Sequence, residues 1–224
     1  MKISCVWEHN GSDSILHASS YVGAYTRGET KDIALQKMAG EIVSYLKWKG
    51  EAVPDALEVM IVQEKASGLM ISDADSDVLF EEERKTLSGA EYEELKALAL
   101  KSAQDFLDLY EAIPDREKSC LPVRMTFYGQ VPRTASEMYE HTKNVNDYYF
   151  GEIGVETDHE GTIVECRQRG FAMLESQPDF LENIVYPGSY GEEWSLRKVL
   201  RRFIWHDRIH AKAMYRMAVK TFGG

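Results

Sequence analysis

Four long stretches with helical periodicity follow residue 88, and they constrain the fold more than any other feature of the chain. They cover approximately residues 88–112, 133–152, 160–176 and 191–221. Apolar residues recur in them every three or four positions, as in helices that bury one face. Loops rich in proline and glycine separate the stretches. Four such helices predict an all-α four-helix bundle over residues 88–224.

The first third of the chain has a different pattern and predicts a small mixed domain over residues 1–66. Strand-like runs lie at residues 2–8, 15–19 and 57–64. A helix is predicted to begin after Thr30, a suitable N-cap, and to end at Gly50. Residues 67–87 are rich in glycine, serine and acidic side chains, so we expect a connector there. The predicted fold class is α+β, with a β-α-β domain before the bundle.

Composition narrows the possible functions. The 224 residues contain 26 Lys and Arg against 37 Asp and Glu, a formal net charge of −11, which disfavours nucleic acid as a partner. No apolar run approaches the ~20 residues that span a bilayer, and the N-terminus has no export signal. Three cysteines at wide spacings fit reduced thiols better than disulfides. We therefore expect a cytoplasmic protein without a membrane partner.

The last helical stretch contains the sharpest chemical feature, a pair of histidines four residues apart. His206 and His210 share one face of the predicted helix. The same face carries apolar residues at helical spacing, namely Leu196, Val199, Phe203, Ala213 and Met217. Both imidazoles should therefore point into the core, where a polar group without a partner costs about 1 to 3 kcal/mol. A shared metal ion would satisfy both.

The second helical stretch offers a third ligand. His141 lies in the middle of a largely apolar face, and its alternative role is that of a core histidine with hydrogen-bond partners. Together with the histidine pair, it is predicted to bind the metal. The other three histidines lie in a turn, a short strand and a loop, and are not expected to be ligands: His9, His17 and His159.

Three short motifs in the C-terminal segment resemble the DinB/YfiT-like four-helix bundles. They are Ser136–His141 (SEMYEH), Glu193–Arg197 (EWSLR) and Trp205–His210 (WHDRIH). The resemblance implies a divalent metal, zinc or nickel, held by the three histidines named above. It also implies a reaction with a low-molecular-weight thiol in some members, and assembly as a homodimer.

Three imidazole ligands would leave a coordination position open to water or a substrate thiol, which favours catalysis over a closed structural site. Tyr148 and Glu137 are the candidate catalytic residues, the former through its hydroxyl. Glu137 and Asp207 could instead accept a ring N–H from a ligand histidine, or simply face water. The basic residues between Arg197 and Arg208 are expected to form a solvated face that could attract an anionic substrate.

The N-terminal domain is weakly similar to the HicB-like antitoxin fold. The similarity rests on the strand order, on the turn Arg27–Thr30 and on the helix that contains Ala34. It implies a protein partner, although the bundle stands where that family has a small DNA-binding domain. We expect an accessory or dimerising domain.

The leading hypothesis is a metal-dependent enzyme with a small-molecule substrate, such as a thiol-dependent transferase, a hydrolase or an isomerase. The alternative is a non-enzymatic interaction or regulatory protein whose N-terminal domain binds a protein partner. Metal content separates the two hypotheses, because only the enzyme needs a bound ion with an open position.

Overall fold

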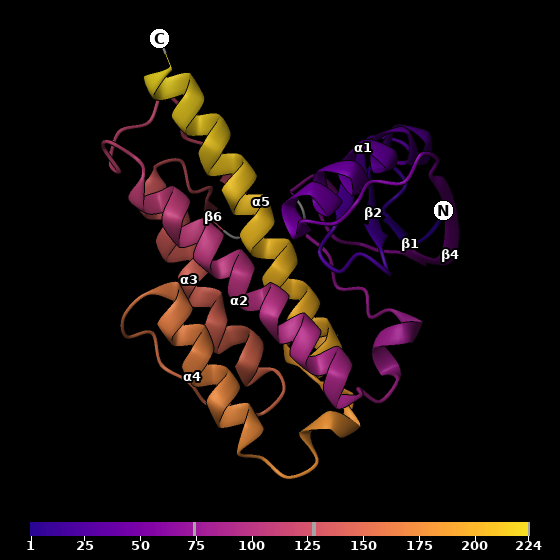
Figure 1. Ribbon diagram of the computed structural model, residues 1–224. Coiled ribbons are helices and arrows are strands. Elements are labelled where there is room, and N and C mark those ends of the chain that lie inside the picture. The colour runs from indigo at the N-terminus through magenta and orange to yellow at the C-terminus, as the bar shows by residue number, and fades with distance from the viewer. Residues whose placement is uncertain (74, 127–128, 224) are drawn as a thin grey trace. The chain divides into compact units, whose positions relative to one another are not determined.

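A computed structural model describes residues 1–73, 75–126 and 129–223, and the chain divides into two compact units (Figure 1). The first unit is Met1–Lys85 with Ser189–Glu193, and the second is Thr86–Gly188 with Trp194–Gly224. The presence of both helices and sheets agrees with the predicted α+β class. Among the described residues, no helix combines the length and the apolar character needed to cross a bilayer.

The first unit is built on a four-stranded sheet in the order β3-β2-β1-β4. The strands are β1 (Lys2–His9), β2 (Ser14–Ala18), β3 (Tyr25–Gly28) and β4 (Glu58–Ala66). β1 runs antiparallel to β2 and parallel to β4, and β2 runs antiparallel to β3. The three predicted strands are confirmed to within two residues, whereas β3, which leads into the predicted turn at Arg27–Thr30, was not predicted.

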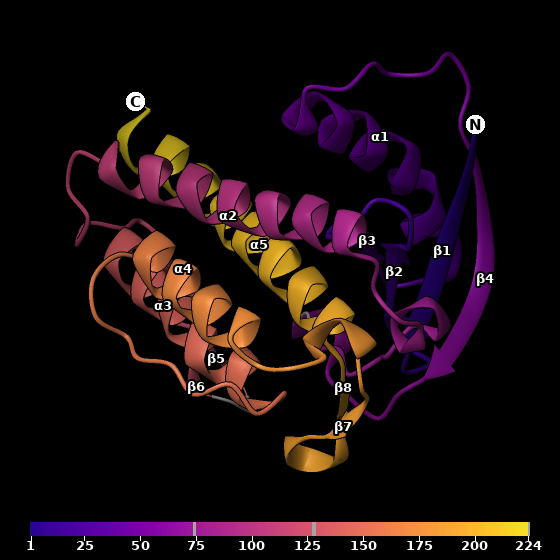
Figure 2. The ribbon, with the colours of Figure 1, turned by 60° about the horizontal axis from the view of Figure 1, so that its bottom comes forward.

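Helix α1 (Lys31–Lys49) covers one face of the sheet (Figure 2). The Thr30 side chain caps it by accepting a hydrogen bond from the backbone N–H of Ile33 at 3.3 Å. Gly50 ends it with a φ of 80°, a left-handed conformation that glycine adopts without strain. Both predicted ends of this helix are therefore confirmed. Buried residues of α1 and of the strands form one apolar core, including Ile3, Leu16 and Met38.

Part of the segment predicted as a connector lies against the opposite face of the sheet, through Ser76, Val78 and Phe80. This segment contains the short 3-10 turns Ile71–Asp73 and Glu81–Arg84. Val78 and Phe80 are buried and pack with Val6 of β1. Because it contributes to this second apolar cluster, the segment belongs to the first unit.

The second unit contains four helices, α2 (Gly89–Glu111), α3 (Ala135–Gly151), α4 (Ile163–Glu175) and α5 (Leu196–Phe222). α2 packs against α4 and α5, and α3 packs against the same two helices, so the four lie side by side (Figure 1). The first three begin with capping boxes in which a Ser or Thr pairs with a Glu three residues later, at Ser88, Thr134 and Thr162. The four predicted helices are confirmed.

Helix α5 begins five residues later than predicted. Its N-cap is Ser195, whose side chain accepts from the backbone N–H of Lys198 at 3.3 Å. The residues before it form the short elements β7 (Tyr186–Pro187), the 3-10 turn Ser189–Gly191 and β8 (Glu193–Trp194). Two further short elements lie between α2 and α3, β5 (Met125–Thr126) and β6 (Gly129–Gln130), and the 3-10 turn Phe180–Glu182 follows α4.

Candidate metal centre

The structure brings the three predicted ligand histidines together within the second unit. α3 carries His141, and α5 carries His206 and His210. One nitrogen atom from each ring lies within 4.8 Å of the other two. The ring centroids are 5.1 Å apart for His141 and His206, 4.8 Å for His141 and His210, and 4.4 Å for His206 and His210. Two helices from distant parts of the sequence thus supply one cluster of imidazoles.

Burial favours the neutral form of the imidazoles in this cluster. Burial lowers the pKa of His141 and, with the nearby His210 and His141 rings, lowers the pKa of His206 well below its usual value. Burial, reinforced by His141, lowers the pKa of His210 to about 3. A neutral imidazole keeps a lone pair on one ring nitrogen, which is the form that ligates metals.

The donor set fits a divalent transition metal. Imidazole nitrogens suit zinc and nickel. Two nitrogens that share one tetrahedral zinc ion lie about 3.4 Å apart, so the more widely spaced of the three would move closer on ligation. His206 is only 9% exposed, and its Nδ1 atom is enclosed without a hydrogen-bond partner among the described residues. A bound metal ion would provide a partner for a buried imidazole nitrogen of this kind, which the surrounding protein does not provide.

The predicted catalytic residue Glu137 lies at the N-terminus of α3, where it serves as a cap. Its Oε2 atom accepts hydrogen bonds from the backbone N–H of Arg133 at 2.8 Å and of Thr134 at 3.2 Å. The Thr134 side chain in return accepts from the Glu137 backbone N–H at 3.1 Å. This carboxylate therefore has a structural role of its own at the start of the helix that carries His141.

Tyr148 is 37% exposed, and its ring centroid lies 5.5 Å from that of Tyr149 and 5.9 Å from that of Trp194. Sequence reasoning missed its neighbour. Tyr149 is buried, and its ring centroid lies 6.1 Å from that of His206, in an edge-on arrangement. The buried positions of α3 include Met138, Thr142 and Asn146. Tyr149 lies two helical turns after the buried Thr142 and so shares its face. Tyr148 lies two turns after the half-buried His141, which is why the sequence pointed to Tyr148 instead.

Asp207, the other predicted partner of a ligand histidine, bonds elsewhere. Its carboxylate accepts from Ser102 Oγ at 2.6 Å and from the guanidinium of Arg167 at 2.5 and 3.1 Å. All three side chains are buried. Arg167, to which the sequence analysis assigned no role, is the main partner of this carboxylate.

The expected solvated basic face of α5 is also wrong. Lys198, Arg201, Arg202 and Arg208 are between 0% and 8% exposed. Aromatic rings surround part of this group: the Arg202 guanidinium lies 5.4 Å from the Trp194 ring centroid and 5.7 Å from that of Tyr149. Such rings attract a cation through their faces, so arginine and lysine can be buried against them.

The other three histidines lie outside the cluster. His9 stacks on Trp7 and lies 3.2 Å from Glu64, His17 packs near Phe80, and His159 lies 3.2 Å from Asp147. Within the described residues, His141, His206 and His210 form the only group of three or more His, Cys, Asp or Glu side chains placed closely enough to share a metal ion.

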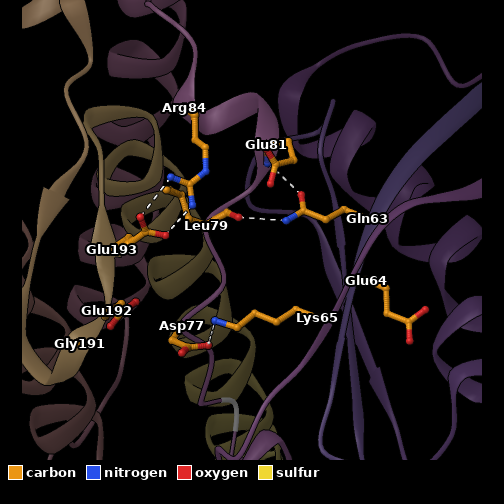
Figure 3. A pocket seen from close by; sticks show the side chains of 10 residues that line it. All are labelled: Gln63, Glu64, Lys65, Asp77, Leu79, Glu81, Arg84, Gly191, Glu192 and Glu193. Atoms are coloured by element: carbon orange, nitrogen blue, oxygen red, sulfur yellow. Dashed lines mark hydrogen bonds and ion pairs between the residues drawn. The ribbon is translucent and has the colours of Figure 1, made fainter.

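A hollow of about 260 Å³ lies in the first unit and is lined mainly by polar side chains (Figure 3). Its two basic residues form ion pairs, Lys65 with Asp77 at 2.7 Å and Arg84 with Glu193 at 2.5 Å. The Gln63 amide binds the Leu79 carbonyl and the Glu81 backbone N–H. The polar groups of the hollow thus bond mainly to one another, and the imidazole cluster remains the stronger candidate site.

Comparison with protein-family models, with curated proteins and with solved structures gives no match to this chain. The DinB/YfiT-like and HicB-like resemblances therefore stay predictions, supported by the residues quoted for them.

Proposed function

We propose that the second unit is a DinB-like four-helix bundle that binds zinc or nickel and acts as a metal-dependent enzyme. His141, His206 and His210 would hold the ion. The observation that carries the proposal is the convergence of these three imidazoles, each with a lowered pKa, from two helices.

The reaction class follows from the number of ligands. When bound, a divalent cation supplies Lewis acidity toward a water molecule or a thiol. Three protein ligands leave room for such a molecule, whereas a structural zinc site has four. The resemblance to the DinB/YfiT-like bundles adds a low-molecular-weight thiol as co-substrate, so the proposed activity on a small substrate is a thiol-dependent transfer, a hydrolysis or an isomerisation.

The surrounding residues have distinct parts in this proposal. The buried Tyr149 ring lies edge-on to the His206 ring and would shield that imidazole from water. Tyr148 is exposed enough to meet a substrate and could orient it through the phenol hydroxyl. Glu137 would act through the capped end of α3, so its replacement should affect helix stability before it affects chemistry.

Metal analysis of tag-free protein tests the proposal. We expect a stoichiometric amount of zinc or nickel in the purified or reconstituted wild type, and its loss in the double variant His141→Ala, His206→Ala. His159→Ala is the matched control, because His159 lies in a loop of the same unit and should leave the metal content unchanged. No metal after reconstitution, or equal metal in the double variant, would overturn the metal site.

Activity is tested on the same samples. Consumption of a thiol and an electrophile, measured by loss of free thiol, should require the metal-loaded wild type and disappear in the double variant. A loaded protein that turns over neither thiol-dependent nor hydrolytic substrates would contradict the enzymatic part of the proposal.

The second candidate function is a non-enzymatic interaction protein, and strand β4 is the observation that favours it. β4 lies at the edge of the described sheet, and Met60 and Val62 on it are 39% and 56% exposed. An edge strand of this length can pair with a strand from another chain, which also fits the expected homodimer. Light scattering after size-exclusion chromatography of wild type and Val62→Lys tests it, since a dimer formed through β4 should dissociate in the variant.

A further inference from the structure

One fully buried side chain connects all four helices of the second unit. Arg167 of α4 is 0% exposed. Its guanidinium donates to the Ala99 carbonyl of α2 at 3.0 Å, to Asn146 Oδ1 of α3 at 2.9 Å, and to the Asp207 carboxylate of α5 at 2.5 and 3.1 Å. Ser102 of α2 donates to the same carboxylate at 2.6 Å. We call Arg167, Asp207, Asn146 and Ser102 the guanidinium hub.

Stability alone is a poor explanation for this hub. Removing two opposite charges from water is unfavourable, and well-packed apolar residues of similar volume often replace a buried ion pair without loss of stability. The hub nevertheless satisfies its charges with short hydrogen bonds, and the guanidinium also lies 4.1 Å from the Phe203 ring centroid. A buried polar group whose desolvation is unfavourable, but whose hydrogen bonds are all made, can specify one arrangement of the helices that it joins.

The two helices that carry the imidazoles are both held by the hub. On α5, Asp207 directly follows His206 and precedes His210 by three residues. Because successive residues of an α-helix are about 100° apart, fixing the direction of the Asp207 side chain fixes the directions of both histidines. On α3, Asn146 lies five residues after His141 and constrains that helix in the same way.

We propose that Arg167 is a positioning residue for the imidazole cluster, acting through Asp207 and Asn146 to set the rotation of α5 and α3. This inference rests on the proposed metal site and adds to it the part of the protein that organises its ligands. Arg167 is not one of the proposed ligands and would act only through these contacts. If the hub only stabilised the fold, its replacement by apolar residues would leave metal affinity unchanged.

The test compares metal binding with folding in three variants. Arg167→Met with Asp207→Leu replaces both charges by apolar side chains and leaves no buried charge alone. Asn146→Leu removes the acceptor on α3, together with the hydrogen bond that Asn146 Nδ2 donates to the Lys143 carbonyl at 2.7 Å. Gly170→Ala is the matched control, because it disturbs packing on the same helix, where a Cβ atom would meet the Phe150 ring at 2.1 Å, without removing a hub group.

Zinc affinity is measured by competition with a chromophoric chelator, ligand geometry by the visible spectrum of the cobalt-loaded protein, and folding by thermal unfolding of the metal-free protein. We expect the double variant to stay folded, to bind zinc about 10- to 100-fold more weakly, and to show an altered cobalt spectrum. Asn146→Leu should lose affinity in the same direction, whereas Gly170→Ala should be less stable but keep wild-type affinity and spectrum.

Three results would overturn the inference, and they are distinguishable. Positioning would be refuted, and the metal site would stand, if a folded double variant had the zinc affinity and cobalt spectrum of the wild type. If the double variant does not fold, the same result in Asn146→Leu would refute positioning. Loss of affinity in Gly170→Ala as large as in the hub variants would show a general effect of stability. Absence of zinc binding by the wild type would remove the metal site and the inference with it.

Discussion

Replacing Glu8 by Gln should change how the stability of the first unit depends on pH. Glu8 lies on β1 and is 0% exposed. Its carboxylate accepts from Ser76 Oγ at 2.5 Å and from the Asp77 backbone N–H at 3.2 Å, which ties the segment after β4 to the sheet. Burial, with a contribution from the Asp77 carboxylate, raises the pKa of Glu8 to about 7. His17 also faces this group, with Nε2 3.4 Å from Ser76 Oγ.

The magnitude follows from the shift in pKa. The folded state holds the proton of Glu8 more tightly than the unfolded state, whose pKa is near 4.5. The resulting stabilisation is complete below pH 4.5 and is lost as the pH rises through about 7. A pKa difference of this size corresponds to about 3 kcal/mol in the free energy of unfolding. Glutamine does not ionise, so Glu8→Gln should not show this loss.

Hydrogen exchange followed by mass spectrometry measures the opening of the first unit separately from the second. We compare the free energy of opening for peptides from β1 and from residues 75–80. Relative to wild type, this free energy should increase in Glu8→Gln by about 3 kcal/mol between acidic and alkaline pH. Glu58→Gln is the control, because Glu58 is an exposed residue on the neighbouring strand β4. Parallel pH profiles for wild type and Glu8→Gln would refute the reasoning, since they would show an ordinary carboxyl group.

Two further predictions concern packing and thiol reactivity. Gly170→Ala should lower the thermal midpoint of the second unit, because overpacking against the buried Phe150 ring costs about 1 to 3 kcal/mol and outweighs the helix propensity of alanine. Gly151→Ala, which has no atom within 4 Å of the new Cβ, should not, and equal midpoints for the two would contradict this account. A thiol reagent should label the native chain first at Cys120, which is exposed, since burial raises the pKa of Cys5 to about 12. Intact-protein mass spectrometry of wild type and Cys120→Ser checks this, and equally fast labelling of Cys5 would count against it.

Local signals predicted the secondary structure well because they act within a few residues. The Thr30 cap and the left-handed Gly50 delimit α1, and apolar periodicity located the four helices of the second unit. The start of α5 was misplaced because residues before Ser195 share the composition of a helix but form turns and a short strand. Composition also suggested a connector at 67–87, although Val78 and Phe80 are buried against the sheet.

The imidazole cluster could be predicted from the sequence to a similar degree. The spacing of His206 and His210 places them on one face of any helix, and the apolar residues around His141 made it the natural third member. The surroundings were less accessible, because a contact between two helices depends on their relative rotation. Tyr149 and Arg167 were missed for this reason, and Asp207 proved to bind a guanidinium on another helix.

Periodicity, caps and residue chemistry in the chain alone thus defined the α+β class, the positions of the main helices and the three histidines. These features depend on residues a few positions apart in the chain, and the regular geometry of a helix or strand fixes how such residues lie. The convergence of His141 with His206 and His210 to within 4.8 Å, the raised pKa of Glu8 and the four-helix contacts of Arg167 arise only after folding. Each depends on burial and on side chains that lie far apart in sequence, and packing of the whole unit decides where such groups meet.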